Sequence, residues 1–299
     1  MNRSDIMFNT IIEEICKELN IKYTYLSNKW IIKLDKLNKT KYIIGEKFDL
    51  NKYISAISID DKNALYEILN NISIPSCIHN IIFNNISKKE LTNIFIKYNN
   101  DVVIKPNIGC SGIDVYRIKD KEELIKKTNQ LLKKYTSISI CPYYNIKYEY
   151  RVIVLDNEVK LVFRKENAKI VGDGKSSIKE LLIKFNKYYF ENKDLPETIL
   201  KKDEKYTYDW RFNLSKGSIA SISIDDKLKD KLSKIAVDVT NELNIRFASV
   251  DIIELNNNEL LILEANNCVT LNKCINFIPN GYNIAKDIYK EAMIKMFED

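Results

Sequence analysis

The most restrictive feature of this sequence is a pair of apolar runs, residues 249–255 and 259–265, on either side of three asparagines. Short runs rich in Ile, Leu and Val, interrupted by turn residues, predict the two strands of a β-hairpin. If the turn centres between Asn257 and Asn258, Asp251 faces Glu264, and Asn266 lies on the same side of the hairpin. The opposite face is then apolar, and its residues are Val250, Ile252, Leu261, Leu263 and Ala265.

Two carboxylates and an amide oxygen at one strand end are hard oxygen ligands. Mg²⁺ prefers such ligands together with water and substrate phosphates. Two carboxylates directly opposite each other repel unless a cation lies between them. Asp251, Glu264 and Asn266 are therefore candidate metal ligands. A hairpin that turns a polar face to solvent explains the same residues equally well.

A second hairpin is predicted over residues 148–166, where Asp156 and Asn157 form a two-residue turn. In that register Glu149 faces Arg164, and Arg151 lies on the same side. The opposite face is apolar, with Val152, Val154, Val159, Leu161 and Phe163. The polar side is either a cross-strand salt bridge, worth well under ~1 kcal/mol if exposed, or a wall for ribose hydroxyls and an anionic substrate.

Three other segments combine glycine with charged side chains. Lys105 ends an apolar strand before the turn 107–113, whose backbone N–H groups could cradle a phosphate. That turn lacks the Gly-Lys-Ser/Thr of a Walker A loop, so a plain hairpin is its default interpretation. Residues 172–174 are a Gly-Asp-Gly turn before a helix, and Arg211 could hold a phosphate through two hydrogen bonds. The alternative interpretation is a plain turn for residues 172–174 and a surface loop for the segment around Arg211.

Histidine and cysteine usage restricts the chemistry. His79 is the only histidine, so a Ser-His-Asp triad or a His-rich metal site would depend on it alone. We interpret His79, which follows a proline-containing stretch, as structural. The six cysteines form no Cys-x-x-Cys pair, which argues against a disulfide framework or a zinc site. Carboxylates, lysines, arginines and backbone groups are left to carry the chemistry.

The 299 residues suggest about two modules, at roughly 150 residues each. With 45% hydrophobic and 29% charged residues the chain is not a disordered one. No apolar run approaches the roughly 20 residues of a membrane helix, and acids near the N-terminus argue against a signal peptide. We expect a cytoplasmic protein without a membrane partner. The net charge of +6 is dispersed, so we expect no nucleic-acid partner.

Helical and strand patterns alternate along the chain, which predicts an α/β fold. Helices are expected at 8–20, 62–71, 90–99, 121–135, 226–245 and 282–297. Asp60 and Asp61 would cap the helix 62–71. Short strands are expected near 21–27 and 30–34, and residues 41–56 are interpreted as a connection.

These elements, in this order, resemble the ATP-grasp superfamily, and most closely its amino-acid ligase branch. That branch includes cyanophycin synthetase, the ATP-grasp module of bifunctional glutathione synthetases, and RimK-like ligases. The similarity covers residues 56–299 and rests on five segments: DDKNALYEILNNISIPSC, VVIKPNIGCSGIDV, YEYRVIVLDNEVKLVFRKENAKIVGDGKSSIKELL, WRFNLSKGS and VDIIELNNNELLILEANN. It implies an ATP-grasp fold, with a small α/β module at 1–55, a first lobe at 56–138 and a second lobe at 139–299.

The resemblance also implies roles for individual residues. They are Lys62 and Lys105 for the nucleotide, Gly109, Ser111 and Gly112 in its glycine loop, Tyr143 and Tyr144 in the adenine hinge, Glu149 for ribose, Arg211 and Asn213 near the γ-phosphate and a second metal, Arg164 for the acyl substrate, and Asp251, Glu264 and Asn266 for Mg²⁺ or Mn²⁺. The hinge has no acid, and the segment after Asn266 has no proline or glycine, unlike many relatives.

The activity implied by the resemblance is that of an ATP-dependent carboxylate–amine ligase acting through an acylphosphate on an amino acid or peptide. ATP and Mg²⁺ or Mn²⁺ are the expected cofactors, and small carboxylates and amines the expected partners. A homo-oligomer remains open. The alternatives are a nucleotide-binding regulator without ligase activity and an ATP-grasp protein that only transfers phosphate.

Overall fold

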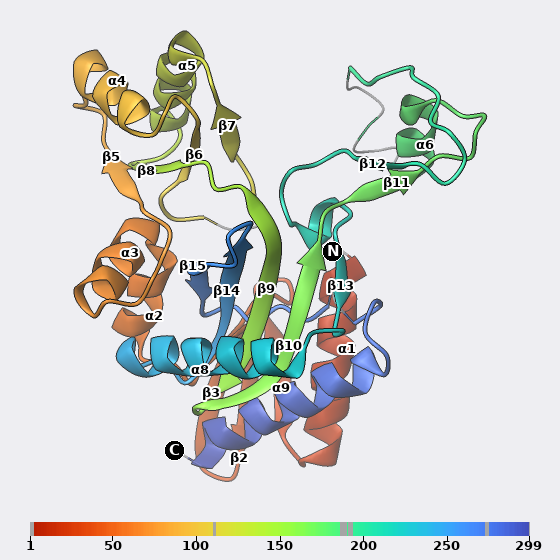
Figure 1. Cartoon of the computed structure of the whole chain (residues 1–299). Helices are drawn as coiled ribbons and strands as arrows, with labels where there is room; N and C mark the ends of the chain where they lie inside the picture. Colours follow the sequence, from red (N-terminus) through yellow and green to blue (C-terminus); the bar gives the residue numbers. More distant parts are fainter. Residues whose placement is uncertain (1–2, 110–111, 186–189, 191–193, 273–274, 299) are drawn as a thin grey trace.

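The computed structural model describes residues 3–109, 112–185, 190, 194–272 and 275–298. Its centre is a five-stranded antiparallel sheet in the order β13-β10-β9-β14-β15. The strands are β9 (Ile146–Leu155), β10 (Glu158–Glu166), β13 (Ile219–Ser221), β14 (Phe247–Leu255) and β15 (Leu260–Asn266). Helices α8 (Asp226–Glu242) and α9 (Gly281–Glu298) pack against this sheet (Figure 1).

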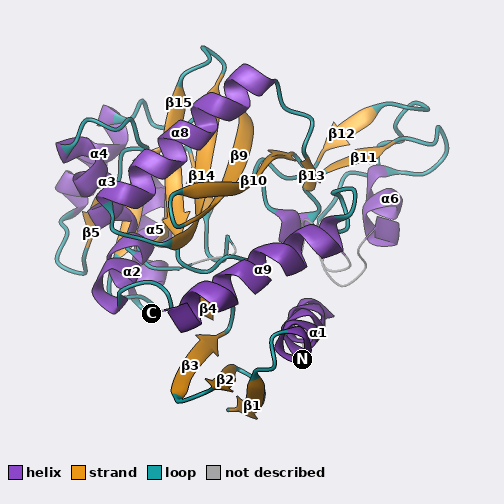
Figure 2. Ribbon diagram, turned by 90° about the horizontal axis from the view of Figure 1, so that it is seen from below, coloured by secondary structure: helices purple, strands orange, loops and turns teal. Residues whose placement is uncertain are grey.

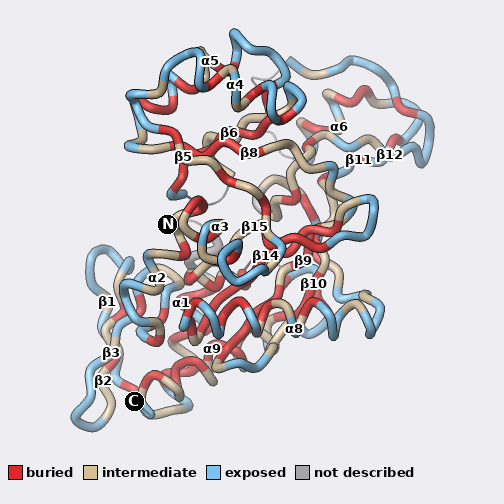
Figure 3. The backbone as a smooth tube through the Cα atoms, turned by 60° about the vertical axis from the view of Figure 1, so that its left-hand side comes forward, coloured by how far each residue is buried: buried red, intermediate tan, exposed pale blue. Residues whose placement is uncertain are grey.

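Alternation along the central strands sends side chains into two different cores. Val152, Val154 and Val250 pack with the apolar stripe of α8 on one face. Ile153 and Phe247 pack on the other face with α9 and the N-terminal elements. Both faces are therefore covered, and Figure 3 shows burial concentrated along these strands.

The N-terminal elements are one helix and four short strands: α1 (Arg3–Glu18), β1 (Lys22–Leu26), β2 (Ile31–Lys36), β3 (Lys39–Ile44) and β4 (Lys47–Phe48). The strands form an antiparallel sheet in chain order. The interpretation of residues 41–56 as a connection was wrong, because β3, β4 and the start of α2 (Tyr53–Asp60) lie there. Each of these two strands has a single buried residue, Ile43 in β3 and Phe48 in β4.

The N-terminal sheet and α1 share one core with α9 and the central sheet. The Phe48 ring is stacked on Tyr289 of α9, with centroids 5.4 Å apart, and meets Phe247 of β14 edge to face at 5.3 Å. Figure 2 shows α1 and α9 side by side below the central sheet. The N-terminal elements are thus held in place by the rest of the chain.

A second, four-stranded sheet lies above the central one, in the order β5-β8-β6-β7 (Figure 1). Its strands are β5 (Asn80–Ile82), β6 (Val102–Pro106), β7 (Tyr116–Ile118) and β8 (Ile138–Pro142), and its helices are α4 (Lys88–Lys97) and α5 (Lys121–Leu132). Apolar residues of both helices pack on one face of the sheet. Strand β8 begins at residue 138, where the predicted first lobe ends. It is nevertheless hydrogen-bonded to β5 and β6 of the upper sheet.

Helix α3 (Lys62–Asn71) follows α2 at the side of the central sheet and begins as the sequence predicts. Asp61 is its N-cap, and its carboxylate accepts a hydrogen bond from the Ala64 N–H at 2.9 Å. A small outlying unit contains β11 (Lys169–Val171), β12 (Lys205–Thr207) and α6 (Ile178–Phe185), with its own apolar cluster. None of the helices in the described part of the chain is long and apolar enough to cross a membrane.

Both predicted long hairpins form, and each contains a β-bulge. Asp156 and Asn157 both have positive φ, as a type I′ turn requires, but Lys160 is an extra residue, since Val159 faces Val154 while Leu161 faces Ile153. Glu149 consequently faces Lys165 and not Arg164. Leu161 and Phe163 point into the core with α9, not into the one with Val152.

The bulge in the second hairpin has the opposite effect on the prediction. Near the turn Ile252 faces Ile262, one residue away from the predicted register, but the extra residue Leu263 restores it, so that Asp251 faces Glu264. Leu261 and Leu263 were predicted to share the core of Val250, and this prediction was wrong. They pack in a separate cluster with Cys77 and Ile253.

Candidate functional site

The end of the last hairpin gathers the three predicted metal ligands. Asp251 faces Glu264 directly, and Asn266 faces Ser249, two pairs further along. Asp251 is fully buried, whereas Glu264 and Asn266 are half-buried. Because residues two apart on a strand share a face, these three side chains lie on one side of the sheet. The predicted convergence of two carboxylates and an amide is confirmed as geometry.

Asp251 belongs to a buried network of four charged side chains. Arg151 donates two hydrogen bonds to its carboxylate, at 2.7 and 2.6 Å, and Lys165 lies 3.0 Å from Oδ2. The Lys165 ammonium also donates to Glu149 at 2.5 Å. Burial opposes ionisation, but Arg151 and Lys165 outweigh it and hold the pKa of Asp251 well below its usual range.

Glu149 responds differently in the same network. Burial raises its pKa to about 7, although Lys165 acts in the other direction. The charge of Asp251 adds to the increase. Glu149 is only 6% exposed, and its carboxylate is bound by Lys165. The network thus holds two carboxylates and two cations beside the candidate metal ligands.

Lys62 of α3 and Lys105 of the upper sheet are two further buried cations. Lys62 and Lys105 are each 8% exposed. The Lys62 ammonium donates to the backbone oxygens of Asn107 and Gly109, at 3.4 and 2.9 Å, which ties α3 to the loop after β6. Among the described residues, no hydrogen-bond partner is found for the Lys105 ammonium. Two buried cations thus lie near the start of the glycine-containing loop.

The segment leading from β8 into β9 joins the two sheets. The Tyr144 hydroxyl accepts a hydrogen bond from the Ile78 N–H at 2.9 Å, and its ring packs with Cys77. The Arg117 guanidinium lies 3.2 Å from the centre of the Tyr143 ring, and Trp210 meets the same ring edge to face. Tyr143 therefore contacts β7 of the upper sheet and the loop before β13.

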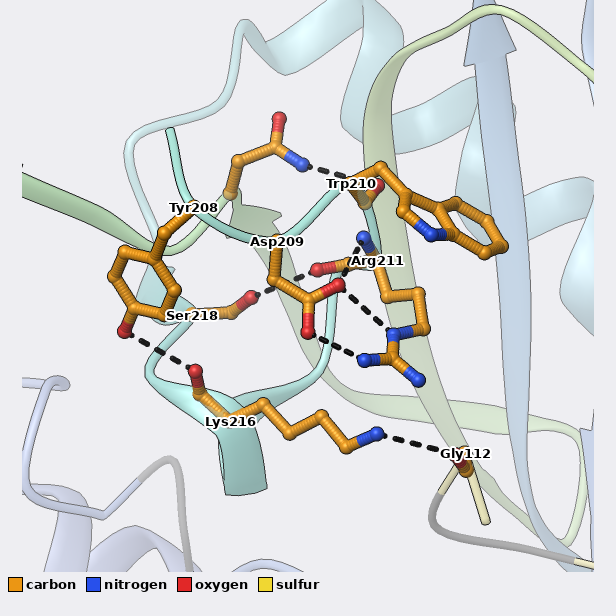
Figure 4. Close-up of polar contacts among 8 residues, drawn as sticks. Gly112, Tyr208, Asp209, Trp210, Arg211, Lys216 and Ser218 are labelled. Carbon is orange, nitrogen blue, oxygen red and sulfur yellow. Dashed lines mark hydrogen bonds and ion pairs between the residues drawn. The ribbon is translucent and has the colours of Figure 1, made fainter. Parts of the chain in front are cut away.

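A loop before β13 contacts the glycine-containing loop (Figure 4). Asp209 accepts two hydrogen bonds from the Arg211 side chain, at 2.8 and 2.7 Å. Lys216 of the short helix η1 (Leu214–Lys216) donates to the backbone oxygen of Gly112 at 3.2 Å. Gly112 has φ +64°, and a Cβ there would lie 2.8 Å from Asn213 Nδ2. Glycine is thus the residue that fits this contact.

Comparison with known proteins identifies the fold. Residues 201–291 match the model of the RimK-like ATP-grasp domain. The D-alanine–D-alanine ligase of Bacillus anthracis has a TM-score of 0.59 at 16% identity, over 85% of this chain and 71% of that one. A bifunctional glutathione synthetase from Pasteurella multocida has a TM-score of 0.57 at 19% identity, over 97% and 44%. This chain has the ATP-grasp fold.

A similar curated protein is the bifunctional protein of glutathione biosynthesis from Clostridium perfringens. It is 24% identical over 251 residues, which are 74% of this chain and 32% of the relative. The chain thus spans about a third of the length of this relative. The family model covers α8, both strands of the last hairpin and most of α9, so the candidate metal ligands lie inside the matched region.

The resemblance implied that Arg164 contacts the acyl substrate, and the predicted hairpin register put it on the side of Glu149. The structure places it elsewhere, because the bulge at Lys160 reverses which side chains share a face. Arg164 faces Tyr150, is bound to Glu166 at 2.6 Å, and lies 4.7 Å from the ring centre of Tyr148. It is therefore on the α8 side of the sheet. Ser111, which was predicted to belong to the glycine loop of the nucleotide site, lies outside the described residues.

The residues present fit ATP and a divalent cation. The hairpin contributes two carboxylates and one amide, which leaves coordination positions for water and phosphate oxygens, as Mg²⁺ requires. Among the described residues, no group of three or more His, Cys, Asp and Glu side chains is placed to hold a metal ion. Lys105 lacks a described partner, and a phosphate would provide one.

Sequence reasoning missed three residues that organise this ATP-grasp site. Lys165 was missed because the bulge shifts the strand pairing by one residue, and no feature of the sequence indicates where the extra residue lies. Asn107 binds α3 through its side-chain oxygen, which accepts from the Asn63 N–H at 3.2 Å. Asp209 could have been found, since it lies two residues from Arg211 and an aspartate at that spacing can bind the guanidinium.

The ion pair that positions the Tyr143 stack predicts a pH dependence. Arg117 lowers the pKa of Asp101 from its ordinary 3.8. A lowered carboxylate pKa stabilises the fold above the unfolded value and loses that contribution as pH falls. We expect Asp101→Asn to lower the free energy of unfolding by up to about 1 kcal/mol at pH 7, and this deficit to shrink as pH falls below 3.8. Urea unfolding across this range measures it, and a constant deficit at all pH values would contradict the ion-pair explanation.

Proposed function

We propose that this protein is an ATP-dependent carboxylate–amine ligase that forms an amide through an acylphosphate. The observation that carries the proposal is the arrangement of Asp251, Glu264 and Asn266 on one face of the central sheet, while the charges of Glu264 and Lys105 both act on the buried Cys77. This provides separate ligands for a divalent cation and for phosphate oxygens. The two structural neighbours above are, by name, a D-alanine–D-alanine ligase and a glutathione synthetase.

In the proposed reaction the substrate carboxylate attacks the γ-phosphorus of ATP, and ADP leaves. An amine then attacks the acylphosphate carbon, releases phosphate and gives up a proton to form the amide. A Mg²⁺ ion held by Asp251, Glu264 and Asn266 would offset charge on the phosphates. Lys62, Lys105 and Arg211 would bind phosphate oxygens, since positioning and electrostatic stabilisation dominate phosphoryl transfer.

The loop 208–218 is proposed to complete the site on its open side. The Asp209 carboxylate accepts two hydrogen bonds from the Arg211 side chain and so fixes the plane of its guanidinium group. Lys216 joins the loop to Gly112. Exclusion of water matters, because water would hydrolyse the acylphosphate. Positioning of this loop would therefore protect the intermediate.

The test is ADP release by the full chain with ATP and Mg²⁺ against pools of amino acids and short peptides. We expect release that depends on one of these pools, and a product whose mass equals the carboxylate plus the amine minus water. A product that carries phosphate would show phosphoryl transfer without ligation. ATP binding without release from any pool would favour the second candidate, a nucleotide-binding regulator.

A further inference from the structure

His79 lies just before β5 and has one nitrogen without a partner. Its Nδ1 is 2.8 Å from the Ser139 hydroxyl of β8. The residue is only 4% exposed, and Nε2 has no hydrogen-bond partner among the described residues. A buried polar group without a partner destabilises the fold. Such a group in a native protein calls for an explanation, and an absent ligand is one.

The strand register shows which way the imidazole faces. Ser139 pairs with Lys105, and their neighbours Ile140 and Ile104 point into the core under α4 and α5. Ser139 and Lys105 therefore lie on the opposite face of the upper sheet. His79 shares that face, because its Nδ1 contacts Ser139. Figures 1 and 3 show this face turned toward the central sheet, with α4 and α5 on the far side.

The surroundings of the ring are cationic. Burial lowers the pKa of His79 well below its ordinary value, and the charges of Lys105 and Lys62 lower it further. The imidazole is therefore neutral near pH 7. When the Ser139 hydroxyl donates to Nδ1, the ring proton is on Nε2, which is then a donor. A donor nitrogen and the ammonium of Lys105 are thus both available to an anion on one face.

We propose that His79 is a nucleotide-binding residue whose neutral Nε2–H donates a hydrogen bond to a phosphate oxygen of ATP. This inference rests on the proposed function, because it assumes that ATP lies between the two sheets. It assigns a ligand-binding role to the histidine that the sequence pattern had suggested to be structural. Ser139 is then the residue that fixes the ring tautomer.

The single histidine allows a direct measurement. In ¹⁵N-labelled protein the imidazole gives one set of resonances, which need no assignment. We expect a neutral ring whose Nε2 and its proton shift when AMP-PNP and Mg²⁺ bind, and a similar shift with tripolyphosphate. Adenosine should leave them unchanged. Binding of AMP-PNP, measured by calorimetry on the same sample, with an unchanged imidazole spectrum would overturn the proposal, as would a shift produced by adenosine alone.

Two substitutions separate the nitrogens of the ring. The amide nitrogen of His79→Gln can reach the position of Nε2, whereas His79→Asn retains only a group near Nδ1. We expect His79→Asn to raise the Kd of AMP-PNP about tenfold, and His79→Gln to recover much of that loss. Thr128→Val is the matched control, since it removes another buried polar atom without a partner, on the α5 side of the upper sheet. Its Kd should equal that of the wild type.

The outcomes distinguish the two proposals. A wild-type protein that fails to bind AMP-PNP would contradict the proposed function and His79 with it. Normal binding by wild type and by His79→Asn, with both variants shown by circular dichroism to be folded, would overturn only the role of His79.

Discussion

Replacement of Glu264 by alanine is expected to reduce amino-acid-dependent ADP release at least about a hundredfold, because several kcal/mol of charge stabilisation come from the bound cation. Glu264 is half-buried, and Asp251, directly opposite, is already bound by Arg151 and Lys165. Of the two carboxylates, Glu264 is therefore the one with more capacity for a cation. Steady-state ADP release at saturating ATP measures the effect.

The matched control for this variant is Glu259→Ala. Glu259 is an exposed carboxylate in the same hairpin, beside the turn. Its replacement should leave the rate within about twofold of wild type, since exposed substitutions away from such features change little. Glu264→Ala should also need more Mg²⁺ for half-maximal rate. Equal rates for the two variants would remove Glu264 from the metal site.

Replacement of Lys165 by methionine is expected to lower the free energy of unfolding by about 3 kcal/mol, because removing one partner leaves a buried charge uncompensated. Lys165 is 4% exposed and joins Glu149 to Asp251. In the variant, Asp251 keeps Arg151, but Glu149 loses its cation. Urea unfolding, monitored by circular dichroism, measures the change.

The pH dependence of the Lys165 variant follows from the sign of the Glu149 shift. Its pKa in the folded protein is already raised from 4.5 to about 7, and loss of Lys165 raises it further. A raised carboxylate pKa costs stability as pH increases above the unfolded value. The deficit should therefore be larger at pH 8 than at pH 5. The double variant Glu149→Gln, Lys165→Met should recover part of it, and equal deficits at both pH values would contradict a charge effect.

The sequence predicted the hairpins and helices well because their signals are local. The α3 cap at Asp61 and the type I′ turn at Asp156 and Asn157 depend only on adjacent residues. The strands β3 and β4 were missed because β4 has only two residues and β3 is mostly exposed, so neither has a clear apolar period. Their stability comes from the aromatic contacts of Phe48, which are long-range.

The candidate site was predicted unevenly for a related reason. Counting from a turn gives the register only when no bulge intervenes. In the last hairpin the strand pairing near the turn differs from the predicted pairing by one residue. The bulge at Leu263 restores the predicted pairing, so Asp251 still faces Glu264. In the hairpin of β9 and β10 nothing compensates, and Arg164 lies on the wrong face while Lys165 takes its place.

The central claim is the acylphosphate, and the fate of a carboxylate oxygen tests it most directly. Amino acids labelled with ¹⁸O in the carboxyl group are incubated with ATP, Mg²⁺ and unlabelled amines, and the released phosphate is analysed by mass spectrometry. Ligation through an acylphosphate transfers one labelled oxygen from the carboxylate to phosphate. We predict phosphate that is heavier by one ¹⁸O. Release of ADP with phosphate that contains no label would contradict the account.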